Sequence, residues 1–298
     1  MLKRRRSKRT IQLAKKLKRS QTRSIQVDLV IFLFLGILAM IMVLPLVFAI
    51  SSAFKPMNEL FIFPPKFFPI KPTTQNFTDL FNLMANSWVP FSRYIFNTVF
   101  ITVAGTLGHI LFASLCAYAL AMYKFPGSKA FYALILLALM FSGAVTAIPN
   151  YLTMSKLGWI DTYKSIIVPY LASPLGLFLM KPFMEQNVPK SLLESAKMDG
   201  FNELQIYWFI AMPLVKPAWL TLTLFSVQNL WGMGSSIYIY KENLKTLNFA
   251  MSQIVTGSIA RAGVGSAVSV FMMSIPIIVF IVTQSNVVTT MSTSGIKE

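Results

Sequence analysis

The charged residues divide this sequence into six long uncharged stretches, and this division constrains the fold more than any other feature. Five of the stretches exceed the ~20 residues that a helix needs to cross the hydrocarbon core of a bilayer. The fourth is shorter, but the lysines at its ends can extend toward the interfaces. We therefore predict an all-α, polytopic membrane protein with six transmembrane helices. The uncharged stretches are residues 29–54, 94–123, 130–155, 165–180, 217–240 and 262–296.

The overall composition agrees with this prediction. Hydrophobic residues make up 55% of the 298 residues and charged residues only 12%, which is too little charge to cover a soluble domain of this length. The net charge is +17, and 11 of the 27 basic residues lie between Lys3 and Arg23. A basic arm beside a membrane span is typical of cytoplasmic orientation and of contact with anionic lipids, and it favours these over nucleic-acid binding.

The domain organisation follows from the arm and the apolar stretches. We expect a basic cytoplasmic arm over residues 1–28 and one transmembrane domain over residues 29–298. The first apolar run is too long, and its arm too extended, for a cleaved signal peptide. The predicted spans cover approximately residues 29–52, 94–122, 130–151, 164–183, 213–236 and 265–288.

The distribution of Lys and Arg predicts the orientation. With the N-terminus inside, 18 of the 27 basic residues lie on the cytoplasmic side, although the outer connections are longer. We therefore expect both termini to be cytoplasmic in a bacterial plasma membrane.

The outer connection over residues 55–93 is rich in proline and phenylalanine. This composition is typical of a loop that lies on the membrane face with its aromatic rings at headgroup depth. A docking surface for an external partner is the alternative, and the sequence does not separate the two.

The sequence holds no candidate for catalysis or metal binding. Its one cysteine, Cys116, and its one histidine, His109, both lie inside apolar stretches, where we expect them to be packing residues. They cannot form a hydrolytic set, and no Gly-rich phosphate-binding loop occurs in the chain. We predict that the chain is not an enzyme and binds no metal.

The connection over residues 187–213 is different, because it predicts two short helices joined at a glycine. Pro189 suits the first turn of the first helix, and Ser191 with Glu194 has the spacing of a capping box. Gly200 can adopt the left-handed conformation that ends this helix, and Pro213 is expected to break or bend the second.

This connection resembles the EAA loop of the permease subunits of binding-protein-dependent ABC importers. The resemblance is in Glu194-Ser195-Ala196-x-x-Asp199-Gly200, followed by Met212-Pro213 and Pro217. In that family the loop is the coupling helix, which sits in a cleft of the cytoplasmic ATPase. The resemblance therefore implies coupling roles for Glu194, Ser195, Ala196, Asp199, Gly200 and Pro213, with Glu194 making a polar contact to the ATPase. Ser195 and Met212 depart from the usual Ala and Leu; Ser195 is still small enough for a close approach.

Other segments extend the resemblance over roughly residues 90–298. Ala117-Tyr118-Ala119 with Lys124-Phe125-Pro126-Gly127 is similar to carbohydrate permeases, and residues 240–250 are similar to oligosaccharide permeases of Gram-positive bacteria, some of which take up sugars from acidic polysaccharides. The resemblance implies the type I importer permease fold. It also implies a second permease subunit, expected to be a different chain, two copies of a cytoplasmic ATPase that binds ATP and Mg, and an extracellular solute-binding protein. No cofactor is implied for this chain.

Sugars are held by amides, hydroxyls and aromatic faces, and five residues near span ends have this chemistry. An interhelical hydrogen bond or an aromatic belt is the alternative for each, and it is favoured for Tyr151 and Trp231. The candidates for the substrate pathway are Asn150, Tyr151, Gln228, Asn229 and Trp231.

Three further functions stay open. The first is a secondary transporter; all six uncharged stretches lack Asp and Glu, which argues against proton coupling but not against sodium coupling. The second is an ABC permease for a solute that is not a sugar. The third is a membrane scaffold that transports nothing.

Overall fold

The computed structural model describes residues 25–85, 88–234, 237–256 and 261–294, so most of the basic arm lies outside the described residues. The structure divides into two compact units, Met1–Ser51 and Ser52–Glu298. All regular secondary structure in the described ranges is helical. This agrees with the predicted all-α fold.

The described residues of the first unit form one helix, α2, whose full range is Ile25–Ala53. Its 29 residues give a length of about 43 Å, enough to cross a bilayer. Apolar side chains are exposed on every side of it, as in a helix that faces lipid or another membrane subunit. α2 covers the first predicted span.

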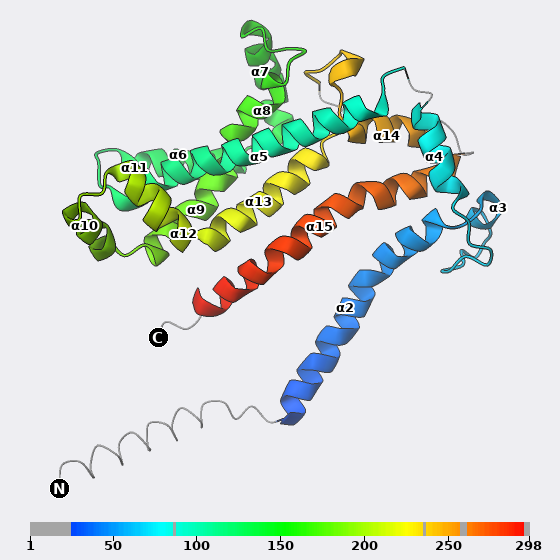
Figure 1. The fold of residues 1–298 in the computed structure, drawn as a ribbon, viewed down its shortest axis with the longest axis horizontal. Helices are drawn as coiled ribbons and strands as arrows, with labels where there is room; N and C mark the ends of the chain where they lie inside the picture. The colour runs from blue at the N-terminus through cyan, green and yellow to red at the C-terminus, as the bar shows by residue number, and fades with distance from the viewer. Residues whose placement is uncertain (1–24, 86–87, 235–236, 257–260, 295–298) are drawn as a thin grey trace. The chain divides into compact units, whose positions relative to one another are not determined.

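The second unit is organised around α5, which covers the second predicted span. Figure 1 shows α5 alongside α13, and α13 alongside α15; α5 also packs on α8 and α9. The short helices α10–α12 lie at one end of α5, whereas α4 and α14 lie at the other. The helices of this unit are α3 (Met57–Leu60), α4 (Gln75–Ala85), α5 (Phe91–Met122), α6 (Ser128–Met140), α7 (Gly143–Lys156), α8 (Lys164–Leu171), α9 (Pro174–Asn187), α10 (Lys190–Met198), α11 (Glu203–Ile206), η1 (Tyr207–Ala211), α12 (Met212–Leu214), α13 (Lys216–Trp231), η2 (Glu242–Leu244), α14 (Leu247–Thr256) and α15 (Ala262–Ser294).

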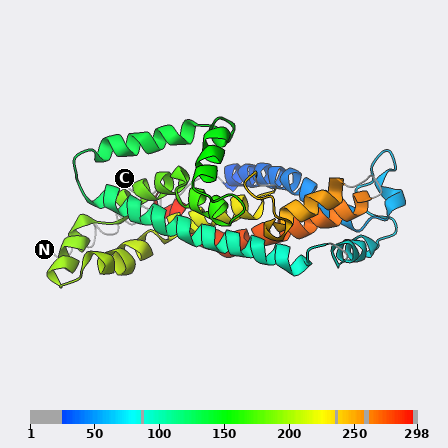
Figure 2. The same ribbon diagram turned by 90° about the horizontal axis from the view of Figure 1, so that it is seen from above.

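The third predicted span is not one helix. α6 and α7 meet at an angle of 107°, and Figure 2 shows α6 running apart from α5 before the chain turns into α7. The break falls at Phe141, which has an extended backbone, and Ser142, whose hydroxyl accepts a hydrogen bond from the Ala144 N–H at 3.2 Å and so starts a new helix.

The fourth and fifth spans also differ from the prediction. α8 and α9 together give a span over Lys164–Asn187, longer than the predicted 164–183. α13 begins at Lys216 after a bend of 80° and has 16 residues, fewer than the predicted 213–236. The described residues therefore hold four helices long enough to cross a membrane, or up to six if each bent pair forms one span.

Small residues allow the helices around α5 to approach closely. A Cβ atom added to Gly105 would lie 2.6 Å from Leu230 of α13, and one added to Gly108 would lie 2.3 Å from Leu171 of α8. Without a hydrophobic driving force between helices in lipid, such close packing is a main source of their association.

His109 lies fully buried where α5, α9 and α13 meet. Its Nε2 lies 3.2 Å from the Ser173 carbonyl and its Nδ1 lies 3.0 Å from the Ser226 hydroxyl. Because a carbonyl only accepts, Nε2 carries the proton and Nδ1 accepts from Ser226. Both ring nitrogens are satisfied, which is the arrangement expected of a packing histidine.

We expect Gly176→Ala to destabilise the bundle by about 1–3 kcal/mol. A Cβ atom on Gly176 would lie 2.5 Å from His109 Nε2 and 2.6 Å from Ala113 Cβ, and neither atom can move away without disturbing the helix contact. The check is the melting temperature in detergent. Gly143→Ala is the matched control, since nothing lies within 4 Å of its added Cβ; equal melting temperatures for the two variants would contradict the prediction.

The N-terminal end of α5 is joined to the segment before α14 by the buried side-chain amide of Asn97. The Asn97 Nδ2 donates to the carbonyls of Asn243 and Lys245, each at 2.8 Å, and its Oδ1 accepts from the Tyr163 hydroxyl at 2.6 Å. The Thr98 hydroxyl accepts from the Leu247 N–H at 2.7 Å. α5 is therefore held at this end by the backbone of a distant connection.

Candidate functional site

Helix α10 forms the first half of the connection that resembles the coupling helix. It begins after Pro189 and ends at Met198, and Gly200 follows with φ +86°. The Phe201 N–H donates to the Ala196 carbonyl at 3.0 Å and the Gly200 N–H to the Lys197 carbonyl at 3.1 Å. Gly200 therefore ends the helix in the left-handed conformation that the sequence predicts.

The two faces of α10 have different environments. Leu193 and Ala196 are buried in the core with residues of α5 and α9, whereas Glu194 and Ser195 are exposed. The Met198 side chain is 88% exposed. The small size of Ala196 thus serves packing inside this chain, and the surface that a partner can approach contains Glu194, Ser195 and Met198.

The capping box lies one helix later than the sequence predicts. Ser191 is inside α10, where its carbonyl accepts from the Ser195 hydroxyl at 2.9 Å, so it does not cap the helix with Glu194. Pro189 has already started that helix. The capping box is formed by Asn202 and Gln205, whose side chains and backbone N–H groups bond reciprocally at 2.9 Å.

The break expected at Pro213 is also displaced. The chain passes through Pro213 in α12, and the 80° bend follows at Val215. The five residues before α12, Tyr207–Ala211, form a π-helical turn. Its wider hydrogen-bonding pattern accommodates the missing proline donor without ending the helix there.

Glu203, in the first turn of α11, joins this connection to the end of α5. Its Oε1 lies 2.6 Å from Lys197 Nζ of the α10 end. Its Oε2 accepts from the hydroxyl of Tyr123 and, at 3.4 Å, from that of Tyr118. The Tyr207 hydroxyl adds a second link, 2.6 Å from Ser114 Oγ on α5. Here "Glu203 node" denotes Glu203 with Lys197, Tyr118 and Tyr123.

Within the Glu203 node, the pKa shifts of Glu203 and Lys197 favour the charged form of each side chain. The Lys197 ammonium and the Tyr123 hydroxyl hold the pKa of Glu203 below its usual value, and Glu203 in turn raises the pKa of Lys197. Burial, and then the carboxylate, raise the pKa of Tyr123. The carboxylate therefore stays ionised as an acceptor at neutral pH. No sequence pattern indicates this site, because the two tyrosines lie about eighty residues earlier in the chain.

The candidates for the substrate pathway do not form one cluster. Gln228 and Asn229 are exposed near the end of α13. Trp231 is buried, and its Nε1 donates to the Met272 carbonyl of α15 at 3.0 Å, so it packs between helices as the alternative interpretation expects. For these three residues, contact with the substrate stays a prediction.

The remaining two candidates lie on α7. Asn150 is exposed, whereas the Tyr151 ring stacks on Tyr238 at 6.2 Å and its hydroxyl lies 3.0 Å from that of Tyr240. Asp161 holds the backbone at Tyr240 in place, since its Oδ1 accepts from the N–H groups of Tyr240 and Lys241. In the described part of the chain, no hydrogen bond joins Asn150 or Tyr151 to the candidates on α13.

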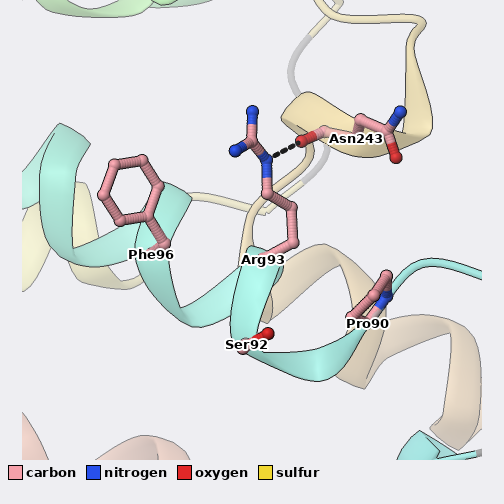
Figure 3. Close-up of a pocket in the computed structure, with 5 residues that line it drawn as sticks. All are labelled: Pro90, Ser92, Arg93, Phe96 and Asn243. Carbon is pink, nitrogen blue, oxygen red and sulfur yellow. Dashed lines mark hydrogen bonds between the residues drawn. The ribbon is translucent and has the colours of Figure 1, made fainter.

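An open cavity of about 620 Å³ lies at the N-terminal end of α5. The sequence did not predict it. Figure 3 shows Arg93 rising from α5 with its Nε donating to the Asn243 carbonyl at 3.2 Å, and Phe96 on the same helix. The guanidinium carbon lies 5.7 Å from the centre of the Phe96 ring. The cavity thus presents a cation that lies over an aromatic ring.

The fold defines a class of protein: an all-helical, multi-pass membrane protein with an exposed short helix, α10, in the connection between two of its candidate membrane segments. Residues 109–291, more than half of the chain, match the model of the family described as "Binding-protein-dependent transport system inner membrane component". The chain belongs to this family. It is therefore a multi-pass permease subunit of the inner (plasma) membrane, works with a binding protein and an ATPase, and is not itself the ATPase.

Individual relatives agree with the family assignment. The chain is 35% identical over 234 residues to protein LplC of Bacillus subtilis, covering 76% of this chain and 75% of that protein. It is 34% identical over 248 residues to the polygalacturonan/rhamnogalacturonan transport system permease protein YtcP of the same species, covering 79% and 80%.

A solved structure is similar as well. A chain from a bacterial ABC transporter involved in the import of the acidic polysaccharide alginate superimposes with a TM-score of 0.73 at 25% identity, covering 88% of this chain and 98% of that one. The predicted ABC importer permease fold is confirmed.

Proposed function

We propose that this chain is the membrane-spanning subunit of an ATP-driven importer for oligosaccharides, forming half of the translocation pathway. The observation that carries the proposal is the exposed face of α10, which presents Glu194 and Met198, while Leu193 and Ala196 on the opposite face belong to the buried core that also contains residues of α5 and α9. Movement at α10 is thereby communicated to helices that cross the membrane. The polygalacturonan/rhamnogalacturonan permease among its relatives supports the substrate class.

The proposal includes partners and orientation. A second permease, expected to be a different chain, supplies the other half of the pathway, and two ATPase copies bind the coupling surfaces. Both termini face the cytoplasm, because the basic residues of the arm and of the α10 connection then lie on the same side. The residues 1–28 serve as an arm on anionic lipid, and 29–298 as the permease domain.

An acidic oligosaccharide is the form of substrate that the cavity at Arg93 suits. The Arg93 side chain is exposed at the cavity, and a guanidinium fits a sugar carboxylate in a bidentate manner. The test is uptake into vesicles that hold the complete importer, with a galacturonide and a neutral oligosaccharide compared. Uptake that requires neither the ATPase nor ATP would overturn the importer, whereas ATP-dependent uptake of neither sugar would overturn only the substrate class.

We expect Gln228→Ala and Asn229→Ala to weaken substrate uptake by roughly 5- to 10-fold each, the loss of about one hydrogen bond. Both side chains are exposed on α13, so neither replacement creates a cavity in the core. The check is the substrate dependence of uptake at saturating ATP. Thr223→Ala, on the same helix, is the control; an unchanged substrate dependence in both variants would remove the two residues from the pathway.

A further inference from the structure

Residues 54–73, here named the Phe-Pro loop, form a closed loop at the end of a membrane span. The Phe54 carbonyl accepts from the Thr73 N–H at 2.9 Å. The Asn76 amide donates to the two carbonyls that flank Phe54, each at 2.8 Å. Asn76 also abuts the first turn of α15, because a Cβ atom added to Gly263 would lie 2.3 Å from Asn76 Oδ1. Both ends of the loop are therefore fixed where α15 begins.

Polar side chains within the Phe-Pro loop bond to its own backbone. The Glu59 carboxylate accepts from the N–H groups of Ile70 and Lys71 at 2.8 and 3.0 Å. Lys55 is only 3% exposed, and its ammonium donates to the Lys66 carbonyl. These contacts hold the two sides of the loop together and engage the polar ends of Glu59 and Lys55 within it.

The outside of the loop is strongly apolar. The most exposed of its large apolar side chains are Phe63 at 92%, Phe68 at 67% and Phe61 at 59%, and Ile70 is also exposed. Clustered apolar groups of this kind are rarely left in water by a soluble surface. At a membrane interface, by contrast, aromatic rings at headgroup depth are favourable.

The charges of the loop agree with a lipid surface. Lys66 and Lys71 are exposed beside the aromatic residues, and the one acid of the segment, Glu59, is engaged with backbone N–H groups. Exposed lysines beside apolar side chains suit anionic headgroups above an acyl region. The loop also follows Ala53, the last residue of α2, directly along the chain, so it leaves a span at the interface.

We propose that the Phe-Pro loop inserts Phe61, Phe63 and Phe68 into the lipid leaflet at which the first span ends. Its binding partner is thus the bilayer itself and not a protein. The loop anchors the base formed by Asn76 and the start of α15, and it fixes the depth of this end of the molecule. The alternative is that the exposed side chains of the loop bind the solute-binding protein instead of lipid.

The test uses one environment-sensitive fluorophore on a single cysteine. In a Cys116→Ser background, Phe63→Cys is labelled with a nitrobenzoxadiazole dye, and the full chain is reconstituted in vesicles of phosphatidylcholine with a minority of phosphatidylglycerol. Asn82→Cys on α4 is the matched control, because Asn82 is exposed at the same end but is polar and outside the loop. Lipids with a spin label near the headgroup or deep in the acyl chain report the depth.

The dye at position 63 is expected to emit at shorter wavelength than the dye at 82, and to be quenched more by the shallow than by the deep spin label. Emission and quenching equal to those at position 82 would overturn the proposal. So would a dye at 63 that becomes shielded only when the purified binding protein is added, since this would assign the loop to protein docking. Neither result bears on whether the importer carries sugar.

Discussion

Glu194→Arg is expected to abolish co-purification of the ATPase with the permease and to abolish uptake. Glu194 lies on the exposed face of α10, where Lys197 interacts with its charge but no hydrogen bond holds its carboxylate within the described part of the chain, so the carboxylate can accept a contact from a partner. Reversing a charge at a buried interface costs about 2 kcal/mol or more of binding free energy, which is a loss of affinity of roughly thirty-fold or more. The measurement is retention of the ATPase by the affinity-purified permease, together with uptake in vesicles.

The control for this variant is Glu185→Arg. Glu185 is also an exposed acid beside the same region, but its partner is Lys181, one turn earlier in α9, at 2.7 Å. The replacement therefore reverses a charge without touching α10, and we expect the ATPase to be retained. If Glu194→Arg retained the ATPase and full uptake, the proposed coupling surface would be wrong.

Much of the fold could be predicted because lipid excludes charge. The positions of Lys and Arg mark where the chain leaves the bilayer, and α2 and α5 match the predicted spans closely. Charge does not report whether a helix is continuous, however. An uncharged stretch has the same composition whether its helix is straight or bent. The break at Ser142 was therefore not predicted, and the bend that Pro213 led us to expect occurs two residues later, at Val215.

The local signals around α10 show a second limit. The spacing of a capping box occurs at Ser191 with Glu194 and again at Asn202 with Gln205, and only the second is used. Pro189 decides between them, since it starts α10 one residue before Lys190 and leaves Ser191 inside the helix. Gly200 was predicted correctly because its left-handed conformation depends on the residue itself.

Sequence patterns could not predict the contacts between segments that lie far apart in the chain. The backbone carbonyls that Asn97 binds, at Asn243 and Lys245, have no sequence signature at all. The tyrosines that bind Glu203 are common in membrane helices, and their direction becomes evident only when α5 and α11 are placed together. The residues of the α10 connection could thus be named from the sequence, and the contacts that join this connection to α5 could not.

Glu203→Gln is expected to leave the ATPase bound but to lower uptake roughly 5-fold or more, the lower end of typical coupling free energies between sites. The glutamine keeps the size of the side chain but loses the charge that holds Lys197, Tyr118 and Tyr123 together. Stability is expected to change little, because exposed ion pairs contribute little to it. The measurement is uptake per ATP hydrolysed, which a purely structural role would not alter.

The pH dependence distinguishes this coupling role from simple loss of a contact. The pKa of Glu203 is below its usual value, so the stabilisation from the Glu203 node is present above the ordinary glutamate range and is lost as the pH falls through the lowered pKa. The wild type should therefore lose uptake per ATP in acid, whereas Glu203→Gln should be low at every pH. Glu203→Asp, which keeps the charge on a shorter side chain, should recover part of the ratio. A ratio in Glu203→Gln equal to that of the wild type at neutral pH would show that α10 moves the spans through its apolar packing alone, on Leu193 and Ala196.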